Sequence, residues 1–402
     1  MKIAVLGYGV VGSGVVELMH KNPTSIENKA GLPIEIKYIL DIRDFENSPY
    51  AHLFTKDFNV IVNDPEIEVV VEVIGGLNPA YNFVKQSLLA GKSVVTSNKE
   101  LVSVYGDELL QIAKNNNKNF LFEASVGGGI PIIRPLSQCL AANEIRSITG
   151  ILNGTTNFIL TKMIKEGYSF EDALKMAQQL GYAEANPAAD VDGIDTCRKT
   201  AILASLAYGK HVDPSKIHTE GISEIKLDDV NIANNLGYAI KLLGTIKKCE
   251  DGTLDILVAP SLVSHELPLS SVEDVYNGIL VEGDAVGISM FYGRGAGKLP
   301  TASAVVADII DCAKHINARK YLFWEASDSS FIRDYKSHTC KWYIRINGNI
   351  NNSNIFNNID ILNENGDKVI ITQALSEYEV DEKLNNLGDE AKIVTKLRIF
   401  DI

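Results

Sequence analysis

The sequence predicts an α/β fold of the Rossmann type, a doubly wound parallel sheet, near its N-terminus. Residues 2–6 (KIAVL) have the pattern of a buried strand, and a glycine-rich turn joins them to an apolar helical pattern. Strand-like and helix-like segments then alternate, which is typical of a parallel sheet. We expect this domain to cover 1–130 and to be completed by part of 295–325. The 402 residues leave room for an α+β domain over 131–320 and a small α+β domain over 336–402.

The glycine turn Gly7-x-Gly9-x-x-Gly12 predicts a dinucleotide-binding site. Gly7 permits a tight turn, Gly9 lets the backbone approach a pyrophosphate, and Gly12 allows the helix to pack closely. The helix N-terminus then faces the phosphates. A glycine turn that binds nothing is the alternative. The residues expected to contact the cofactor here are Gly7, Tyr8, Gly9, Val10, Val11 and Gly12.

The ends of the next predicted strands supply further candidates. The strand 34–40 (IEIKYIL) is followed by Asp41 and Arg43. A carboxylate here would bind the ribose diol of NAD and an arginine the 2′-phosphate of NADP, so the sequence leaves the choice of NAD or NADP open. Strands over 68–76 and 92–98 end where ligands of parallel sheets bind. The candidate cofactor contacts at these strand ends are Ile74, Gly75, Ser97 and Lys99. Lys99 would either reach the nicotinamide or be a solvated loop residue.

Two glycine-containing segments follow. Residues 123–130 (EASVGGGI) are expected to form a strand running into three glycines, whose carbonyls would ligate a hard cation such as sodium or simply connect two domains. The turn 153–157 (NGTTN) precedes an amphipathic helix. Its amides and hydroxyls suit a carboxylate-bearing substrate, unless Thr155 or Thr156 is a plain helix cap.

The segment 181–199 (GYAEANPAADVDGIDTCRK) concentrates charges just before the apolar helical run 200–209. Asp195 and Lys199 are spaced i, i+4 and share one helix face. An exposed ion pair worth about 0.3–0.5 kcal/mol is the alternative. Because the helix that follows is apolar around most of its circumference, we expect it to be buried and Lys199 to open into a cleft.

Composition points to a small-molecule partner. The net charge of −13 disfavours binding to nucleic acid or to an anionic membrane surface. The five cysteines are scattered without a CxxC pair, so we expect neither a zinc site nor a disulfide framework but a reducing, cytoplasmic location. No apolar run approaches the length needed to span a membrane, and the N-terminus lacks a signal-peptide pattern.

Several of these segments, taken in order, resemble the homoserine dehydrogenase family over nearly the first 320 residues. The matching words are GYGVVG, EVIGG, TSNK, FEASVGGGIPII, GILNGTTNFIL, LGYAEANPAADVDGIDTCRK and YGRGAGKLPTASAVVADI. The resemblance implies oxidation of L-homoserine to L-aspartate 4-semialdehyde, or its reverse, with NAD(P). It also implies that 131–320 binds substrate and dimerises, giving a homodimer or homotetramer, within threonine, methionine and isoleucine biosynthesis.

The resemblance assigns roles to matched positions. Lys199 would donate and accept the proton, and Lys99 would be a second lysine at the reaction centre. Arg43 would contact a 2′-phosphate. The expected substrate contacts are Glu184, Asp195, Asp190 and Thr155. The remaining cofactor contacts are Gly181, Gly295 and Gly297, and the carbonyls of Glu123, Val126, Gly128 and Ile130 would hold a sodium ion.

The chain departs from the family pattern in two places. Asn186 stands where the family usually has an aspartate, and a structural role is expected for it. The C-terminal segment resembles a shortened ACT domain, with strands at 341–346, 367–375 and 391–400 and helices near 354–362 and 378–388. Its usual proline-glycine turn is replaced by NGNINNSN, so the domain would regulate, dimerise or only cap the fold.

The sequence also leaves open a function other than catalysis. A non-catalytic, dinucleotide-sensing regulatory protein with an amino-acid-binding C-terminal domain would need the same lysines and carboxylates only for structure. It would show ligand-dependent assembly without turnover of any alcohol. Aspartate-semialdehyde dehydrogenase chemistry is disfavoured, because it needs a nucleophilic cysteine and neither Cys139 nor Cys197 has an adjoining base in the sequence.

Overall fold

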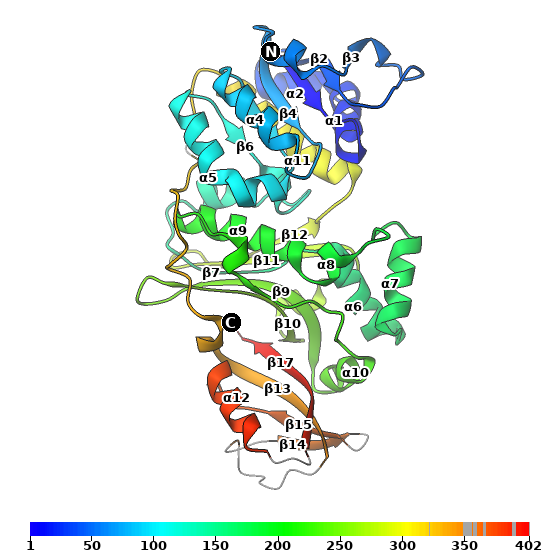
Figure 1. Cartoon of the computed structure of the whole chain (residues 1–402), viewed down its shortest axis with the longest axis vertical. Helices are drawn as coiled ribbons and strands as arrows, with labels where there is room; N and C mark the ends of the chain where they lie inside the picture. The colour runs from blue at the N-terminus through cyan, green and yellow to red at the C-terminus, as the bar shows by residue number, and fades with distance from the viewer. Residues whose placement is uncertain (321, 349–355, 357–359, 365–366, 388–390, 402) are drawn as a thin grey trace.

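Three blocks of secondary structure follow one another along the long axis of the molecule, with the N-terminal sheet at one end and the C-terminal strands at the other (Figure 1). The computed structural model describes the whole chain except residues 321, 349–355, 357–359, 365–366, 388–390 and 402. In the part of the chain that it describes, no helix is both long and apolar enough to cross a membrane.

The N-terminal block is built on a six-stranded sheet with the order β3-β2-β1-β4-β5-β6, and every pair of neighbours is parallel. The predicted Rossmann-type sheet is therefore confirmed. Its strands are β1 (Lys2–Leu6), β2 (Glu35–Leu40), β3 (Phe54–Thr55), β4 (Ile67–Glu72), β5 (Ser93–Thr96) and β6 (Phe120–Leu121). Its helices are α1 (Val10–Lys21), α2 (Pro23–Ala30), α3 (Phe58–Val62), α4 (Ala80–Leu89), α5 (Lys99–Asn115) and, from late in the chain, α11 (Lys298–Lys314), which packs against α1 and α2.

The second sheet is mixed and joins the middle block to the C-terminal block. Its strands run in the order β12-β11-β7-β9-β10-β17-β13-β15-β14, with β8 beside β10 and β16 beside β13. The middle strands are β7 (Ile145–Ile151), β8 (His218–Thr219), β9 (Tyr238–Lys248), β10 (Leu254–Ser264), β11 (Tyr276–Gly283) and β12 (Gly287–Arg294). The C-terminal strands are β13 (Thr339–Gly348), β14 (Asp360–Glu364), β15 (Asp367–Ile371), β16 (Leu375–Ser376) and β17 (Ala391–Phe400).

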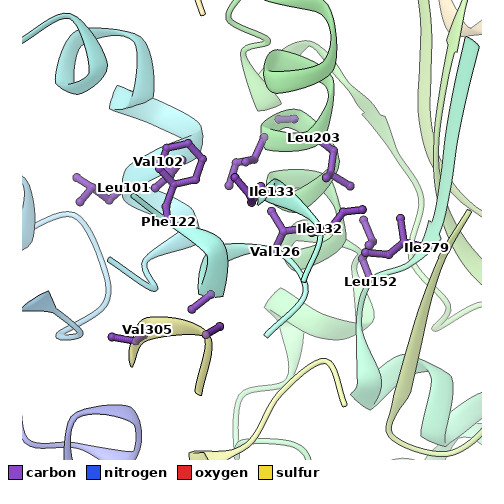
Figure 2. Close-up of a cluster of buried hydrophobic side chains, with 14 of the residues drawn as sticks. Leu101, Val102, Phe122, Val126, Ile132, Ile133, Leu152, Leu203, Ile279 and Val305 are labelled. Carbon is purple, nitrogen blue, oxygen red and sulfur yellow. The ribbon is translucent and has the colours of Figure 1, made fainter. Parts of the chain in front are cut away.

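Helices cover the second sheet and link it to the first. They are α6 (Gly154–Glu166), α7 (Phe170–Gln179), α8 (Ala188–Val191), α9 (Ile194–Tyr208), α10 (Leu227–Asn235) and α12 (Glu377–Asn385). The helix expected after Lys199 is α9, and its central turns are buried as its apolar sequence predicts. One hydrophobic cluster spans both sheets, because it includes Phe122 near the first sheet, Leu203 of α9 and Ile279 of β11 (Figure 2). The two blocks therefore share a core.

Two predicted elements are wrong. Residues 123–130 are not a strand but a short 3₁₀ helix, Glu123–Ser125, followed by a turn. The Glu123 carboxylate explains this turn, because it accepts hydrogen bonds from the amides of Ile132, Ile133 and Arg134 and so folds the chain back on itself. The helix expected near 354–362 overlaps β14, which pairs with β15 as a hairpin, and its residues 354, 355 and 357–359 lie outside the described part.

Candidate active site

The glycine turn after β1 has the geometry that a dinucleotide requires. Gly7 has φ +98°, and a Cβ atom on Gly12 would lie 1.9 Å from the Gly7 carbonyl oxygen. A side chain at position 12 would therefore push the start of α1 away from the strand. A Cβ atom on Gly9 would meet no atom within 4 Å, so the turn opens outward at the position expected to face the pyrophosphate. These residues fit a bound nicotinamide dinucleotide.

Asp41 and Arg43, after β2, form one unit with this turn. Arg43 donates two side-chain hydrogen bonds of 2.9 Å to the Asp41 carboxylate, which also accepts a 2.8 Å bond from the amide of Tyr8. These bonds, those from Arg43 above all, hold the pKa of Asp41 well below its usual value. The Asp41 side chain is 7% exposed and that of Arg43 is 58% exposed. The guanidinium is therefore the more accessible partner of the pair.

A buried glutamate that the sequence reading missed organises the loop after β4. The Glu72 carboxylate, which is fully buried, accepts hydrogen bonds from the amides of Ile74 and Gly75 and from the hydroxyl of Thr96. Burial is the largest influence on this carboxyl and raises its pKa. Asn98 then donates a 2.6 Å bond to the Gly76 carbonyl. These hydrogen bonds hold the loops after β4 and β5, which carry predicted cofactor contacts, against each other.

Lysines and carboxylates meet where α5 and α9 begin. Lys99 is the first residue of α5, and its Nζ lies 2.5 Å from Asp195 Oδ1. Lys199 Nζ lies 2.8 Å from Asp195 Oδ2 and donates a 2.7 Å hydrogen bond to the Leu152 carbonyl. The structure thus brings together Lys99, Asp195 and Lys199. The i, i+4 pair is formed and is buried, with side-chain exposures of 9% for Lys199 and 4% for Asp195, so the alternative of an exposed ion pair does not hold.

Burial and mutual charge perturb all three groups. Burial is the largest influence on Lys199 and lowers its pKa, with the Lys99 charge acting in the same direction and Asp195 opposing both. Burial alone would also lower the pKa of Lys99, but the Asp195 carboxylate raises it. The two ammonium groups outweigh burial at Asp195 and hold its pKa below the usual value. Lys199 is therefore the lysine of this cluster that is more readily deprotonated.

Asn153 completes the cluster, although the sequence reading treated it only as part of a polar turn. Its Nδ2 donates to Asp190 at 2.7 Å and to Asp195 at 2.9 Å, while its Oδ1 caps α6 by accepting from the Thr156 amide. Burial raises the pKa of Asp190, against the opposing hydrogen bond from Asn153. Asparagine is a common helix N-cap residue, so the sequence NGTTN indicates the cap of α6. It does not indicate the contacts of Asn153 with Asp190 and Asp195.

Other candidate substrate residues lie in or against the loop after α7. The Thr155 hydroxyl donates a 2.7 Å bond to the Tyr182 carbonyl and so holds this loop against α6. Glu184 is exposed, and its carbonyl accepts a bond from Gln178. Gly181 has φ +74°, and a Cβ atom there would meet no atom within 4 Å.

The remaining predicted contacts lie where the two sheets meet. A Cβ atom on Gly128 would lie 2.1 Å from the Gly295 carbonyl oxygen, so the turn after Glu123 packs directly on the 295–297 turn. Gly297 has φ +118° and precedes α11. Gly127 accepts a 2.9 Å bond from the Ile130 amide within the same turn.

A dinucleotide-binding parallel sheet whose ligand edge carries a buried lysine–carboxylate cluster defines an NAD(P)-dependent oxidoreductase. The model of the homoserine dehydrogenase family matches residues 131–310, and the model for the NAD binding domain of homoserine dehydrogenase matches residues 7–123. The chain belongs to the homoserine dehydrogenase family, which confirms the resemblance found in its sequence.

Individual relatives agree with this assignment. A homoserine dehydrogenase of Synechocystis sp. is 47% identical over 320 residues, which are 77% of this chain and 73% of that protein. The crystal structure of a homoserine dehydrogenase from Thiobacillus denitrificans matches with a TM-score of 0.90 and 33% identity, covering 100% of this chain and 98% of the other. A hyperthermophilic archaeal homoserine dehydrogenase in complex with NADPH matches with a TM-score of 0.65 and 29% identity, over 77% of this chain and 96% of the other.

Proposed function

We propose that the cluster of Lys99, Asp195 and Lys199 catalyses the NAD(P)-dependent interconversion of L-homoserine and L-aspartate 4-semialdehyde. The observation that carries this proposal is the buried Lys199–Asp195 pair, 2.8 Å apart, which Asp195 joins to Lys99 just after β5 of the parallel sheet. A non-catalytic sensor is not favoured, because the relatives that match most of the chain are named as dehydrogenases.

The proposed role of Lys199 is to carry the proton of the substrate hydroxyl. A bound nicotinamide would supply or accept the hydride. During reduction negative charge grows on the aldehyde oxygen, and an adjacent ammonium both stabilises that charge and can then release its proton. Burial has already lowered the pKa of Lys199, so losing the proton costs less free energy than for a solvated lysine. Lys99, whose pKa is raised, would remain charged and assist electrostatically.

The proposed substrate contacts follow the family resemblance. L-Homoserine carries an ammonium group, which a carboxylate would bind. Asp195 and Glu184 are proposed for this contact, with Asp190 and Thr155 beside them. The hydrogen bond from Asn153 supports the proposed substrate contact of Asp190, because it fixes the position of this half-buried carboxylate. Glu184 is exposed, so its side chain would turn toward the cluster when substrate binds.

We propose that the cofactor is NADP or NAD and that it contacts the glycine turn, Arg43 and the residues predicted at the ends of the strands. Arg43 would bind the 2′-phosphate of NADP, and its exposure supports this role. Gly9 would face the pyrophosphate, because a Cβ atom there would meet no atom within 4 Å, while Gly7 and Gly12 would shape the turn that holds it. The other proposed contacts are Tyr8, Val10, Val11, Ile74, Gly75, Ser97, Lys99, Gly181, Gly295 and Gly297.

A sodium ion is proposed at the turn that follows Glu123. The donors would be the backbone carbonyls of Glu123, Val126, Gly128 and Ile130. Hard oxygen donors on one buried turn fit a hard cation. The Glu123 carboxylate is engaged with three backbone amides, so only its carbonyl would serve.

The oligomeric state, the cellular location and the division into domains are further proposals. We propose a homodimer or homotetramer and a cytoplasmic location, the latter supported by five unpaired cysteines. We also propose a division into 1–130 with part of 295–325, 131–320 and 336–402. The change from the parallel to the mixed sheet supports its first boundary, whereas the mixed sheet runs through both later parts. An ACT-like character for the last part remains a prediction.

The decisive experiment compares Lys199→Met with wild type. We expect kcat for homoserine oxidation to fall by about 10²–10⁴-fold, the usual loss on removing a general acid–base group. Dinucleotide affinity, measured by fluorescence titration, should stay within about twofold because Lys199 is not among the proposed dinucleotide contacts. Lys175→Met, an exposed lysine on α7, serves as the control and should be unchanged. Normal turnover in Lys199→Met would contradict the proposed role.

A further inference from the structure

Arg398 on β17 lies between two carboxylates from different parts of the chain. It donates a 2.8 Å hydrogen bond to Glu220, just after β8, and a 2.6 Å bond to Glu377 at the start of α12. Its side chain is 5% exposed, and its guanidinium carbon lies 4.9 Å from the Trp342 ring centroid. Arg398 therefore fixes the C-terminal block to the middle block through Glu220.

Glu220 is held from a second side. His218 Nε2 lies 2.9 Å from the same Glu220 Oε1, and the His218 ring stacks on Tyr335 with a centroid separation of 3.5 Å. Burial would raise the pKa of Glu220, but the hydrogen bond from His218 and the Arg398 charge together lower it. Glu220 is therefore a carboxylate anchored between β17 and the segment that leads to the C-terminal block.

The residues around Glu220 pack directly on the segment that carries the lysine–carboxylate cluster. The Ile222 amide donates a 2.8 Å bond to the Val191 carbonyl, and a Cβ atom on Gly221 would lie 2.4 Å from that same carbonyl oxygen. A Cβ atom on Gly193 would lie 3.1 Å from the Glu220 carbonyl oxygen. Segment 218–222 thus touches both the end of α8 and the residue that precedes α9.

That junction determines where the cluster lies. Asp195 is the second residue of α9, and Lys199 follows one turn later on the same face. Asp190 belongs to α8. A shift of the junction would therefore move Asp190, Asp195 and Lys199 relative to Lys99, which belongs to a different helix on the first sheet.

We infer that Arg398 and Glu220 are positioning residues for the substrate site: their ion pair presses segment 218–222 against the α8–α9 junction and so sets the geometry of Asp190, Asp195 and Lys199. This inference rests on the proposed function, since it uses homoserine turnover as its readout. Neither residue touches the reacting groups. Their effect passes through backbone packing at Val191 and Gly193.

Lys396 provides a matched control on the same strand. It lies two residues before Arg398, its Nζ is 5.3 Å from the Trp342 ring centroid, and it bonds to Glu377 at 2.9 Å. Its second bond goes to Asp381 of α12 at 2.7 Å. Lys396 therefore ties β17 to α12, as Arg398 does, but neither of these two bonds reaches segment 218–222.

The experiment measures kcat, KM for homoserine, KM for the dinucleotide and Tm for Arg398→Met, Glu220→Gln and Lys396→Met. For the first two we expect KM for homoserine to rise or kcat to fall so that kcat/KM drops about five- to tenfold, within the range for coupling through packed elements. KM for the dinucleotide should stay within about twofold, because the glycine turn is not touched. Arg398→Lys, which keeps the charge, should recover part of the loss.

The control separates positioning from simple stabilisation. Lys396→Met should leave kcat/KM for homoserine unchanged even where it lowers Tm as Arg398→Met does. Equal kcat/KM values for all three variants and wild type, with only Tm altered, would overturn the inference while leaving the proposed function intact. Glu220→Gln keeps the side-chain shape and serves where Arg398→Met does not fold. Absence of homoserine turnover in wild type would instead contradict the proposed function.

Discussion

Arg43 and Asp41 show how two neighbouring side chains can divide the recognition of a cofactor. The carboxylate is shielded and already accepts bonds from Arg43 and from the Tyr8 amide, whereas the guanidinium has most of its surface in solvent. An incoming 2′-phosphate would meet Arg43 first. Without the arginine, two of the bonds to Asp41 would be lost and the carboxylate could accept hydrogen bonds from a ribose diol.

Arg43→Ala should therefore change cofactor preference. We expect KM for NADP to rise about 10- to 100-fold, as for loss of a hydrogen bond to a charged group, with KM for NAD constant or lower. Initial rates with each cofactor at saturating homoserine measure the effect. Lys56→Ala removes another cation near this loop, one paired with Asp44, and should leave the NADP to NAD ratio unaltered. An equal loss with both cofactors would refute a role for Arg43 in the choice.

Among the elements, β9 contributes a lysine that is almost completely buried. Lys241 is 1% exposed, and its Nζ donates to the Val272 carbonyl at 2.5 Å and to Asn157 Oδ1 at 3.2 Å. Asn157, on α6, in turn donates to three carbonyls of the loop before β11. Strand, helix and loop are thus joined by one ammonium group, and burial lowers its pKa to about 8.

Stability should consequently rise with pH through this one residue. Below about pH 8 Lys241 is protonated in both the folded and the unfolded chain, whereas between there and the ordinary value of 10.5 the unfolded chain binds more protons. Raising the pH across this window should stabilise wild type relative to Lys241→Met by up to about 3 kcal/mol. Urea unfolding of both proteins at pH 7 and pH 10 gives the difference. A difference that does not vary with pH would show that Lys241 titrates normally.

At the scale of the whole molecule, the segment between α11 and β13 connects the two ends of the structure (Figure 1). Trp324 anchors it to the N-terminal block, where its ring centroid lies 5.5 Å from that of Phe122. A Cβ atom on Gly106 of α5 would lie 2.4 Å from Trp324 Cζ2, so the indole fills space that only glycine leaves free. Trp324 is 1% exposed.

Trp324→Ala should lower the free energy of unfolding by about 3–5 kcal/mol, because it leaves a large cavity beside α5. Its neighbour Phe323 is only partly buried, so Phe323→Ala should have a smaller effect. Urea unfolding followed by circular dichroism and by fluorescence tests both variants. Similar losses for the two would mean that the indole is not the anchor.

The sequence predicted most of the first sheet and part of the site. Continuous apolar runs and a glycine turn identify parallel strands locally, and the i, i+4 spacing of Asp195 and Lys199 is a property of one helix. The contacts of Asp195 with Lys99 and Asn153 depend on how separate elements pack, which no local pattern encodes. The same holds for Arg398 and Glu220, which are 178 residues apart in the chain.

The error at β14 has a related cause. Residues 360–364 pair antiparallel with β15, so their conformation is set by a partner strand and not by their own periodicity. At Glu123 the carboxylate accepts hydrogen bonds from three backbone amides that lie about ten residues later in the chain. These bonds override the β-like composition of the segment. Where tertiary contacts decide the local conformation, single-segment patterns fail.

The place of β17 in the second sheet affects how the protein is synthesised. The last long strand of the chain pairs in parallel with β10, which was translated well over a hundred residues earlier. Until β17 has left the ribosome, this part of β10 presents an uncovered strand edge, the kind of surface through which nascent chains aggregate. The completed sheet, and with it the Arg398–Glu220 contact, can therefore form only after β17 has been synthesised and has left the ribosome.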